Sequence, residues 1–243
     1  MPSPNNVLTA DSYIQDGLVF QLDGIEYGGI DDHWIDRIQH APFIATSPVE
    51  HSDVAFVFNE NTSFLANRIV DDRASSQIEC VVQANRASNR LVVFLSNRRF
   101  FWLNQYDLLF WAGTTHKATN KPFEPIMTIS NYQQVMVLNG KSINTATSLT
   151  PRIYSDRSRL GYLDSYYKSF VGKLYAIRIY SRQLSDREIL INQKIDNARF
   201  GLGLNIPDEV LPASRTLSLS EPFELPDESM TEQDLTNETS DER

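Results

Sequence analysis

The sequence has one cysteine among its 243 residues, so the chain can form no internal disulfide. Cys80 lies in the apolar run Ile78–Val82, where a buried thiol packs as a small hydrophobic side chain. We therefore expect neither a disulfide framework nor a cysteine nucleophile. The composition gives no sign of an oxidising compartment.

Long apolar runs are also absent, since no stretch of about 18 apolar residues occurs that could cross a membrane. The first residues, MPSPNNVLTADSY, contain no basic segment followed by an apolar one and so predict no secretory signal. The sequence thus predicts synthesis in a cytoplasm without membrane insertion. A final place outside the cell would require export on a virus particle or by a leaderless route.

The short motifs of common catalytic and cofactor sites are missing. The sequence contains no CxxC, HExxH, P-loop, GxGxxG or GxSxG pattern. Its four histidines, at positions 33, 40, 51 and 116, lie in loop-like surroundings. These absences predict a protein that is not an enzyme and has no cofactor.

The net charge of −9 comes entirely from residues 205–243, which hold 11 acidic and 2 basic residues. Residues 1–85 are nevertheless acidic and residues 86–204 basic. This asymmetry is compatible either with opposite charges on adjacent strands or with an acidic patch that faces a basic one. Basic residues cluster no further than Arg98 and Arg99, so nucleic acid is not an expected partner.

A strand followed at once by a capped helix is predicted near the C-terminus. Tyr175, Ile177 and Ile179 alternate with a second set on the opposite face, made of Leu174, Ala176, Arg178 and Tyr180. Ser185 and Glu188 have the spacing of a capping box, and Leu184 and Ile189 that of a hydrophobic staple. The predicted helix runs to about Asn197, with Phe200 and Gly201 as closing residues.

The rest of the chain reads as short strands separated by turns. In the opening strand, 17–23, Leu18, Phe20 and Leu22 are expected on one face. Asn139-Gly140 predicts a type I′ hairpin turn. Further strands are expected at 41–46, 54–58, 63–65, 77–83, 90–96, 100–103, 107–113, 123–130, 133–138, 141–143 and 160–163.

The run GKLYAIRIYSRQLSDREILINQKIDNARF at 172–200 resembles the C-terminal signature of laminin-G-like domains in the concanavalin A-like superfamily, especially its bacterial and phage branch. Segment 16–24, Trp34, Asp36, segment 54–56 and the hairpin at 135–141 follow in the family's order. The resemblance implies an all-β fold, a two-sheet antiparallel jelly-roll sandwich with one short C-terminal helix. It also implies that Trp34 is a core anchor.

Three segments are predicted. Residues 1–12 form an N-terminal arm, residues 13–203 the laminin-G-like domain, and residues 204–243 an acidic tail punctuated by proline.

Glycan hydrolases on this fold carry an ExDxxE strand. The closest match here, Glu232 to Glu238, is one residue too long and lies in the tail, away from any cleft.

Carboxylate-rich loops hold calcium in several jelly-roll families, and Asp31, Asp32 and Asp36 are the candidates for such a site beside His33. Their spacing matches no fixed ligand pattern, so a solvated loop is the favoured interpretation.

Exposed aromatic side chains could stack on sugars. The candidates are Trp102, Tyr106, Tyr132, Tyr154, Tyr162, Tyr166 and Tyr167. Tyr166 and Tyr167 are neighbours in sequence, and adjacent residues of a strand point to opposite faces, so one of the two is expected to be exposed.

The resemblance implies a non-catalytic recognition or structural module within a larger assembly, foremost a bacteriophage virion, where it would contact assembly proteins or sibling subunits. A carbohydrate-binding module for cell-surface glycans is the alternative, and a glycoside hydrolase is the second alternative. The expected location is the virion, with the cytoplasm as the alternative.

Overall fold

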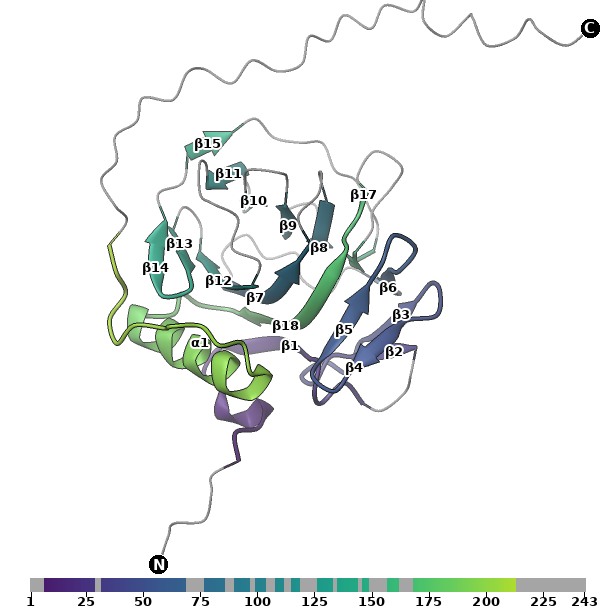
Figure 1. The fold of residues 1–243 in the computed structure, drawn as a ribbon, viewed down its shortest axis with the longest axis horizontal. Coiled ribbons are helices and arrows are strands. Elements are labelled where there is room, and N and C mark those ends of the chain that lie inside the picture. The colour runs from purple at the N-terminus through teal and green to yellow at the C-terminus, as the bar shows by residue number, and fades with distance from the viewer. Residues whose placement is uncertain are drawn as a thin grey trace, which may run out of the picture. The chain divides into compact units, whose positions relative to one another are not determined.

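Two antiparallel β-sheets stack face to face, and one helix covers the outer face of the first sheet (Figure 1). The computed structural model describes residues 7–28, 32–68, 77–85, 90–96, 99–103, 108–111, 115–118, 126–132, 135–143, 146–148, 157–161 and 168–212. In the strands within 90–118, 146–148 and 168–169 it describes the backbone alone. The predicted all-β sandwich with one helix is confirmed.

The first sheet has eight strands among the described residues, in the order β14-β13-β12-β7-β18-β5-β4, with β1 paired to the second half of β18. All its pairings are antiparallel. The strands are β1 (Leu18–Asp23), β4 (Glu50–Ser52), β5 (Ala55–Phe58), β7 (Gln77–Ala84), β12 (Ile126–Tyr132), β13 (Val135–Leu138), β14 (Lys141–Ile143) and β18 (Gly172–Tyr180).

The second sheet has ten strands among the described residues, in the order β15-β11-β10-β9-β8-β16-β6-β3-β2, with β17 paired in parallel to β8. The strands are β2 (His33–Ile35), β3 (Pro42–Ala45), β6 (Phe64–Ala66), β8 (Arg90–Ser96), β9 (Arg99–Leu103), β10 (Leu108–Trp111), β11 (Thr115–Ala118), β15 (Ala146–Ser148), β16 (Arg159–Leu160) and β17 (Lys168–Ser169). β10 has a partner on either side, as its apolar faces predict.

Aromatic side chains fill the space between the sheets. Trp34 is fully buried, its Nε1 donates a hydrogen bond to the carbonyl of Asp23 at 3.1 Å, and its ring lies 4.7 Å from that of Phe56. The prediction that Trp34 anchors the core is confirmed. Cys80 is also fully buried, and burial raises the pKa of its thiol, so it packs as the small hydrophobic side chain that its sequence context predicts.

Two β-bulges change which side chains face the core. The pairing of β1 with β18 shifts register between Leu18 and Phe20, and Leu18 packs under the helix while Phe20 lies in the core. The pairing of β18 with β7 shifts between Leu174 and Ala176, which places Leu174 in the core and Tyr175 on the helix side. The face predictions for Leu18, Leu174 and Tyr175 are therefore wrong, because strict alternation ends at a bulge.

The helix α1 (Asp186–Phe200) begins as the sequence predicts. Ser185 and Glu188 form the reciprocal capping box, and Leu184 packs with Ile189 as the staple. The helix extends to Phe200, beyond the predicted end near Asn197, and Gly201 closes it in the left-handed conformation at φ 62°.

Glu188 also binds Arg182 through two side-chain hydrogen bonds, at 2.6 and 3.0 Å, and these lower the pKa of its carboxyl from 4.5 to about 2. The stabilisation is therefore present above pH 4.5 and is lost as the pH falls toward 2. For Glu188→Gln we expect a loss in the free energy of unfolding of up to about 1 kcal/mol at neutral pH, because this ion pair lies near the surface. In urea titrations between pH 7 and 3, the free energies of unfolding of the native protein and of Glu188→Gln should converge as the pH falls. A difference that stays constant with pH would contradict the assignment.

The chain after α1 packs back onto the first sheet. Asn139 and Gly140 form the predicted hairpin turn with φ 47° and 75°, which confirms it. The Leu211 N–H donates to the Gly140 carbonyl, and the Leu211 carbonyl accepts from Ser142 N–H, so this residue extends the sheet at the β14 edge. Val210 packs against the apolar cluster beneath α1. Packed chain thus continues to residue 212, and the predicted tail beyond it lies outside the described residues.

A chain ending at residue 204 should be less stable than one ending at 212 by about 1–3 kcal/mol, because it loses two backbone hydrogen bonds and the packing of Val210. It should also self-associate more, since β14 becomes an open edge. Urea unfolding and light scattering of the two proteins measure these effects. Equal stability would show that residues 205–212 do not support the sheet.

The described strands β2, β4, β11 and β15 were not predicted. β4 pairs with β5 and ends the first sheet, and β15 pairs with β11 and ends the second. Both are three-residue edge strands, too short to show an alternating pattern. All described residues belong to one compact unit, Met1–Ala213, and none of them forms a helix long and apolar enough to cross a membrane.

Candidate functional site

A buried network of charged side chains joins α1 to the first sheet. The Arg178 Nε donates to Glu79 at 3.0 Å, and its two terminal nitrogens donate to both carboxylate oxygens of Asp196 at 2.8 and 2.7 Å. Asn192 donates a further hydrogen bond to Glu79 at 2.8 Å. Tyr13 donates to Asp196, and its ring centroid lies 4.0 Å from the Arg178 guanidinium carbon.

This network has paired acids but is closed to solvent. Glu79, Arg178 and Asp196 are at most 2% exposed. Burial raises the pKa of Glu79, while the Arg178 charge acts in the opposite direction. The Glu79 carboxylate accepts hydrogen bonds from Arg178, Asn192 and Ser130, so its oxygens already have partners. The arrangement positions α1 on the sheet and leaves no space at these carboxylates for a substrate.

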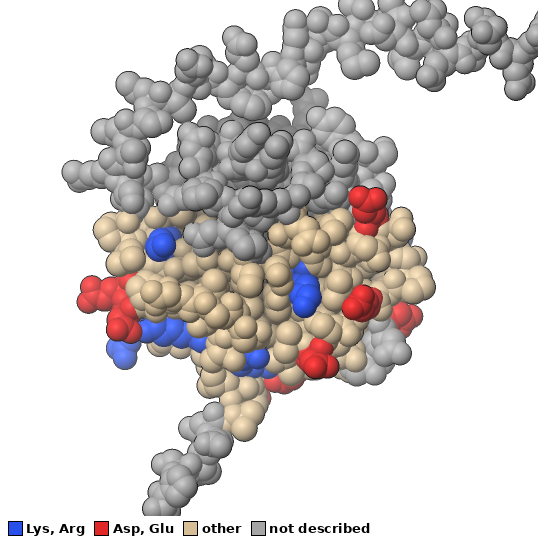
Figure 2. Space-filling view, in the orientation of Figure 1, with Lys and Arg blue, Asp and Glu red and all other residues tan. Residues whose placement is uncertain are grey.

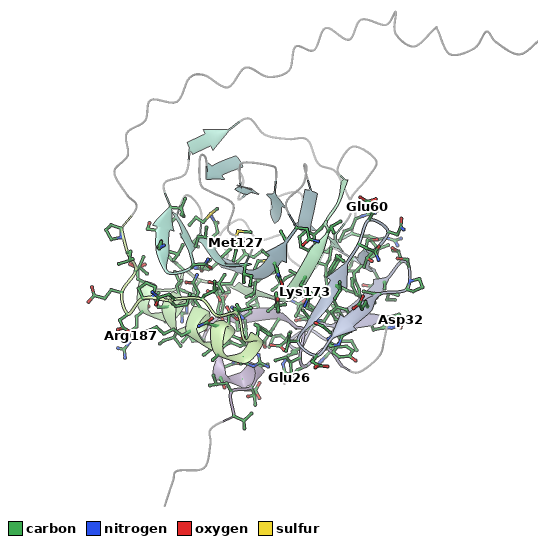
Figure 3. All side chains as sticks on the ribbon, viewed as in Figure 1. Glu26, Asp32, Glu60, Met127, Lys173 and Arg187 are labelled. Carbon is green, nitrogen blue, oxygen red and sulfur yellow. The ribbon has the colours of Figure 1, made fainter. Side chains whose placement is uncertain are left out.

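A ladder of ion pairs ties the N-terminal segment to the end of α1. Arg199 binds Asp23 and also Glu26, the latter at 2.9 Å. Arg37 binds Glu26 from the other side and Asp11 at 3.0 Å. Figure 3 shows Glu26 in the space between α1 and the strands β2 and β4. Part of the predicted arm is therefore fixed, since a 3₁₀ turn (η1) forms at Ala10–Ser12.

The two candidate calcium ligands that the structure describes, Asp32 and Asp36, belong to no metal-binding group. Asp36 is fully buried and accepts backbone hydrogen bonds from Gln21, Ile38 and Gln39, so it closes the edge of β1. Burial raises its pKa despite these bonds. Asp32 is exposed and pairs with His33 Nδ1 at 2.5 Å. Asp31 lies outside the described residues, and no group of three acidic, histidine or cysteine side chains within the described ranges could hold a metal.

Tyr27 and His51 form a half-buried aromatic pair where the two sheets meet at their edges. The ring centroids lie 4.1 Å apart, with 38° between the planes. The Tyr27 carbonyl accepts a hydrogen bond from Ile35 N–H of β2, whereas His51 lies on β4. β2 is the edge strand of the second sheet, and β4, which lies beside β5, is the edge strand of the first sheet. We call this boundary, with Tyr27, Val49 and His51, the β2–β4 seam (Figure 1).

Both rings of the seam rest on the core. Phe56 faces His51 directly across the β4–β5 pair, with ring centroids 4.7 Å apart, and its centroid is 5.3 Å from that of Tyr27. The His51 Nε2 donates to the Gly24 carbonyl at 2.6 Å, which fixes the tautomer because a carbonyl can only accept. Within the described part of the chain no hydrogen bond to His51 Nδ1 occurs, so this atom is a potential acceptor.

Gly24 lets the loop after β1 reach this position. A Cβ atom there would lie 2.4 Å from the Val54 carbonyl oxygen, so a larger residue could not pass the β4–β5 turn. The loop then carries Tyr27 from β1 across to His51. A rigid tyrosine ring and an imidazole acceptor together offer an apolar face and a polar atom, the combination that binds a sugar ring and its hydroxyl groups.

The structure describes little of the predicted aromatic candidates. Tyr132 is half-buried at the end of β12, opposite Val135, which is 48% exposed. Trp102 lies on β9, opposite Leu91 and Leu109, with only its backbone described. The other candidates, Tyr106, Tyr154, Tyr162, Tyr166 and Tyr167, lie outside the described residues. Tyr27 and His51 were missed. The available signal for Tyr27 was an aromatic residue directly before the pair Gly28-Gly29, which is typical of a loop.

Comparison with protein-family models and with curated proteins finds no match. Among solved structures, Trypanosoma rangeli sialidase aligns over 75% of this chain and 33% of its own, at 11% identity and a TM-score of 0.55. The chain therefore spans about a third of that enzyme. Domain 4 of AbnA, a GH43 extracellular arabinanase from Geobacillus stearothermophilus in complex with arabinotriose, aligns over 72% of this chain and 97% of its own, at 12% identity and a TM-score of 0.53.

The binding domain of botulinum neurotoxin DC, in complex with SialylT, aligns over 74% of this chain and 51% of its own, at 13% identity and a TM-score of 0.51. At these identities the similarity shows a shared β-sandwich fold and no more. The laminin-G-like resemblance in particular stays a prediction.

Proposed function

We propose that this protein is a non-catalytic module that binds glycans through the β2–β4 seam. The observation that carries the proposal is the Tyr27–His51 pair, which is held rigidly by Phe56 below and by the Gly24 hydrogen bond at the side. A platform that is ordered before binding loses little conformational entropy when a sugar stacks on it. The two acids of the α1 network are buried and already paired, which supports a binding role over hydrolysis.

The structural neighbours bear on the class of ligand. The AbnA domain is recorded with arabinotriose, and the neurotoxin domain with SialylT. For this chain, glycan recognition is the function that its fold and its half-buried aromatic pair jointly favour.

A glycan array with the purified protein should reveal saturable binding, and Tyr27→Ala should weaken it at least about tenfold, because stacking and its associated apolar burial are lost. Tyr27→Phe should bind nearly as well if the ring face makes the contact. Ile191→Ala, which changes an exposed residue of α1, is the control and should bind as the native protein does.

The same array distinguishes the seam from the other aromatic candidates. Tyr132→Ala, Tyr166→Ala and Tyr167→Ala should leave affinity unchanged. If one of these variants loses binding while Tyr27→Ala does not, the glycan site lies elsewhere on the fold. An array with no saturable signal would overturn the glycan proposal itself.

The second candidate is a structural part of a virus particle. The chain up to residue 212 favours it, because Leu211 pairs at the β14 edge and the sequence that follows it, residues 213–243, is acidic and low in large apolar residues, as expected of a segment that docks on a partner. Deleting residues 213–243 should then reduce incorporation into purified particles. Unchanged incorporation would remove this segment from the mechanism.

A further inference from the structure

The turn at Asn139-Gly140 is enclosed by α1 and by the chain that follows the helix. The Gly140 N–H donates a hydrogen bond to Gln193 Oε1 of α1 at 2.7 Å, and the Gly140 carbonyl accepts one from Leu211 N–H at 3.0 Å. A Cβ atom at Gly140 would lie 2.3 Å from Pro207 Cδ, so the chain after α1 packs directly on this glycine. Figure 1 shows the β13–β14 turn beside α1, and in Figure 2 this part of the surface consists mostly of uncharged (tan) atoms.

The side chain of Asn139 is held in place as well. It is 6% exposed, and its Oδ1 accepts hydrogen bonds from the Thr128 N–H at 2.7 Å and from the Thr128 hydroxyl at 3.2 Å. Its Nδ2 donates to the Ile126 carbonyl at 3.2 Å. Gln193 binds the same strand from above, because its Nε2 donates to the Thr128 carbonyl at 3.2 Å. The Asn139 carboxamide is thus fixed against β12 under the docked helix.

An asparagine followed by glycine is chemically labile, because glycine has no Cβ atom to obstruct the approach of its backbone nitrogen to the carboxamide. In deamidation the Gly140 nitrogen loses its proton to hydroxide and forms a bond to Asn139 Cγ. The Cγ–Nδ2 bond breaks, and Nδ2 takes a proton from water and leaves as ammonia, which leaves a cyclic imide and regenerates hydroxide. Water then opens the ring to aspartate or isoaspartate, so that water is consumed and ammonia is released.

We propose that Asn139 is a latent deamidation site that α1 keeps closed. The reaction requires that the Gly140 N–H lose its proton and that the carboxamide turn toward the Gly140 nitrogen. In the docked state Gln193 binds this N–H, and the bonds to Thr128 and Ile126 hold the carboxamide. Detachment of α1 frees the N–H and admits water to the turn. The rate of modification therefore follows the fraction of molecules in which the helix is detached.

The modification also opposes the return of the helix. Aspartate places an oxygen where Nδ2 donated to the Ile126 carbonyl, so two acceptors face each other in a buried site. Isoaspartate lengthens the backbone within the two-residue turn, whose geometry positions both backbone hydrogen bonds of Gly140. Either product weakens the contacts that Gln193 and Leu211 make with the turn. Detachment of α1 is thus recorded as a covalent change.

The test follows deamidation of Asn139 in the full chain at mildly alkaline pH, by the mass of the peptide that contains it and by its isoaspartate content. In urea, where the chain is unfolded, the reaction should be at least about tenfold faster than in the native protein, because only the open form reacts. Folded Gln193→Ala should react at least about tenfold faster than the native protein, and equally fast in urea. Hydrogen exchange of the Gly140 amide in this variant should accelerate by a similar factor.

Two further proteins keep the test decisive. The chain ending at residue 204 lacks the contacts of Pro207 and Leu211 with Gly140, so it should also deamidate faster than the native protein even if Gln193→Ala does not fold. Phe43→Leu lowers stability at a buried core residue of the second sheet, away from the turn. It should leave the rate at Asn139 as in the native protein while it remains folded.

Three results would overturn the proposal. If Asn139 does not deamidate in urea, or reacts no faster there than in the native protein, it is not a site that the fold protects. An unchanged rate in Gln193→Ala, or in the chain ending at 204 if that variant does not fold, removes the role of the helix and the segment after it. Equal acceleration in Gln193→Ala and Phe43→Leu shows that general unfolding, and not detachment of α1, exposes Asn139.

Discussion

Replacing Arg178 with methionine should lower the free energy of unfolding by about 3–5 kcal/mol. The guanidinium is about 1% exposed and supplies three hydrogen bonds to Glu79 and Asp196. Without it, two carboxylates remain in an interior where water cannot solvate them. Chemical denaturation at pH 7 measures the loss, and its size should exceed that of any single surface ion pair.

Two further variants separate loss of charge balance from loss of packing. Arg182→Met removes a half-buried arginine with two acidic partners and should cost no more than about 1 kcal/mol. Adding Glu79→Gln and Asp196→Asn to Arg178→Met should recover much of the lost stability, because no buried charge is then left unpaired. A cost for Arg178→Met as small as that for Arg182→Met would mean that the network does not hold α1 on the sheet.

Phe56→Ala should destabilise the fold by about 3–5 kcal/mol, the usual cost of removing a large buried ring. Phe56 is fully buried, and its ring contacts Trp34 and Phe64 in the core as well as Tyr27 and His51 at the seam. The variant should therefore also weaken glycan binding under conditions where it remains folded, because the platform loses its support. Denaturation and array measurements on the same preparation test both effects.

The matched substitution Phe56→Leu keeps most of the apolar volume and should cost clearly less. Val137→Ala removes a buried side chain beneath α1, in a different cluster, and controls for general destabilisation. It should lower stability without a specific loss of binding. If Phe56→Ala and Val137→Ala affect binding equally per unit of lost stability, the ring does not support the seam in particular.

Local patterns predicted the elements whose determinants are adjacent in sequence. The capping box of Ser185 and Glu188, the staple of Leu184 and Ile189, and the turn at Asn139-Gly140 need only neighbours a few residues away. The same holds for the burial of Cys80, which its apolar context indicates, whereas the burial of Trp34 was implied by the family resemblance. The assignment to an all-β body with one helix followed from many such signals that agree, and its arrangement as a two-sheet sandwich was implied by the family resemblance.

Local patterns could not predict the bulges at Leu18 and at Leu174, the short edge strands β4 and β15, or the partners of Arg178. Each depends on which strand lies alongside which, and strand pairing joins residues far apart in sequence, as Glu79 and Arg178 are. A pattern of alternating residues contains no information about a partner strand that inserts or omits a residue.

By itself, the sequence determined the all-β body, its capped helix and the charge imbalance between the N-terminal third and the rest, because these are properties of residue type and near spacing. Only the tertiary structure decided that Tyr27 meets His51, since the contact needs two edge strands from different sheets and a glycine at position 24 that lets the chain cross between them. The same packing buries Glu79 and Asp196, the paired acids of the α1 network, and leaves Glu50 and Asp53 exposed to solvent.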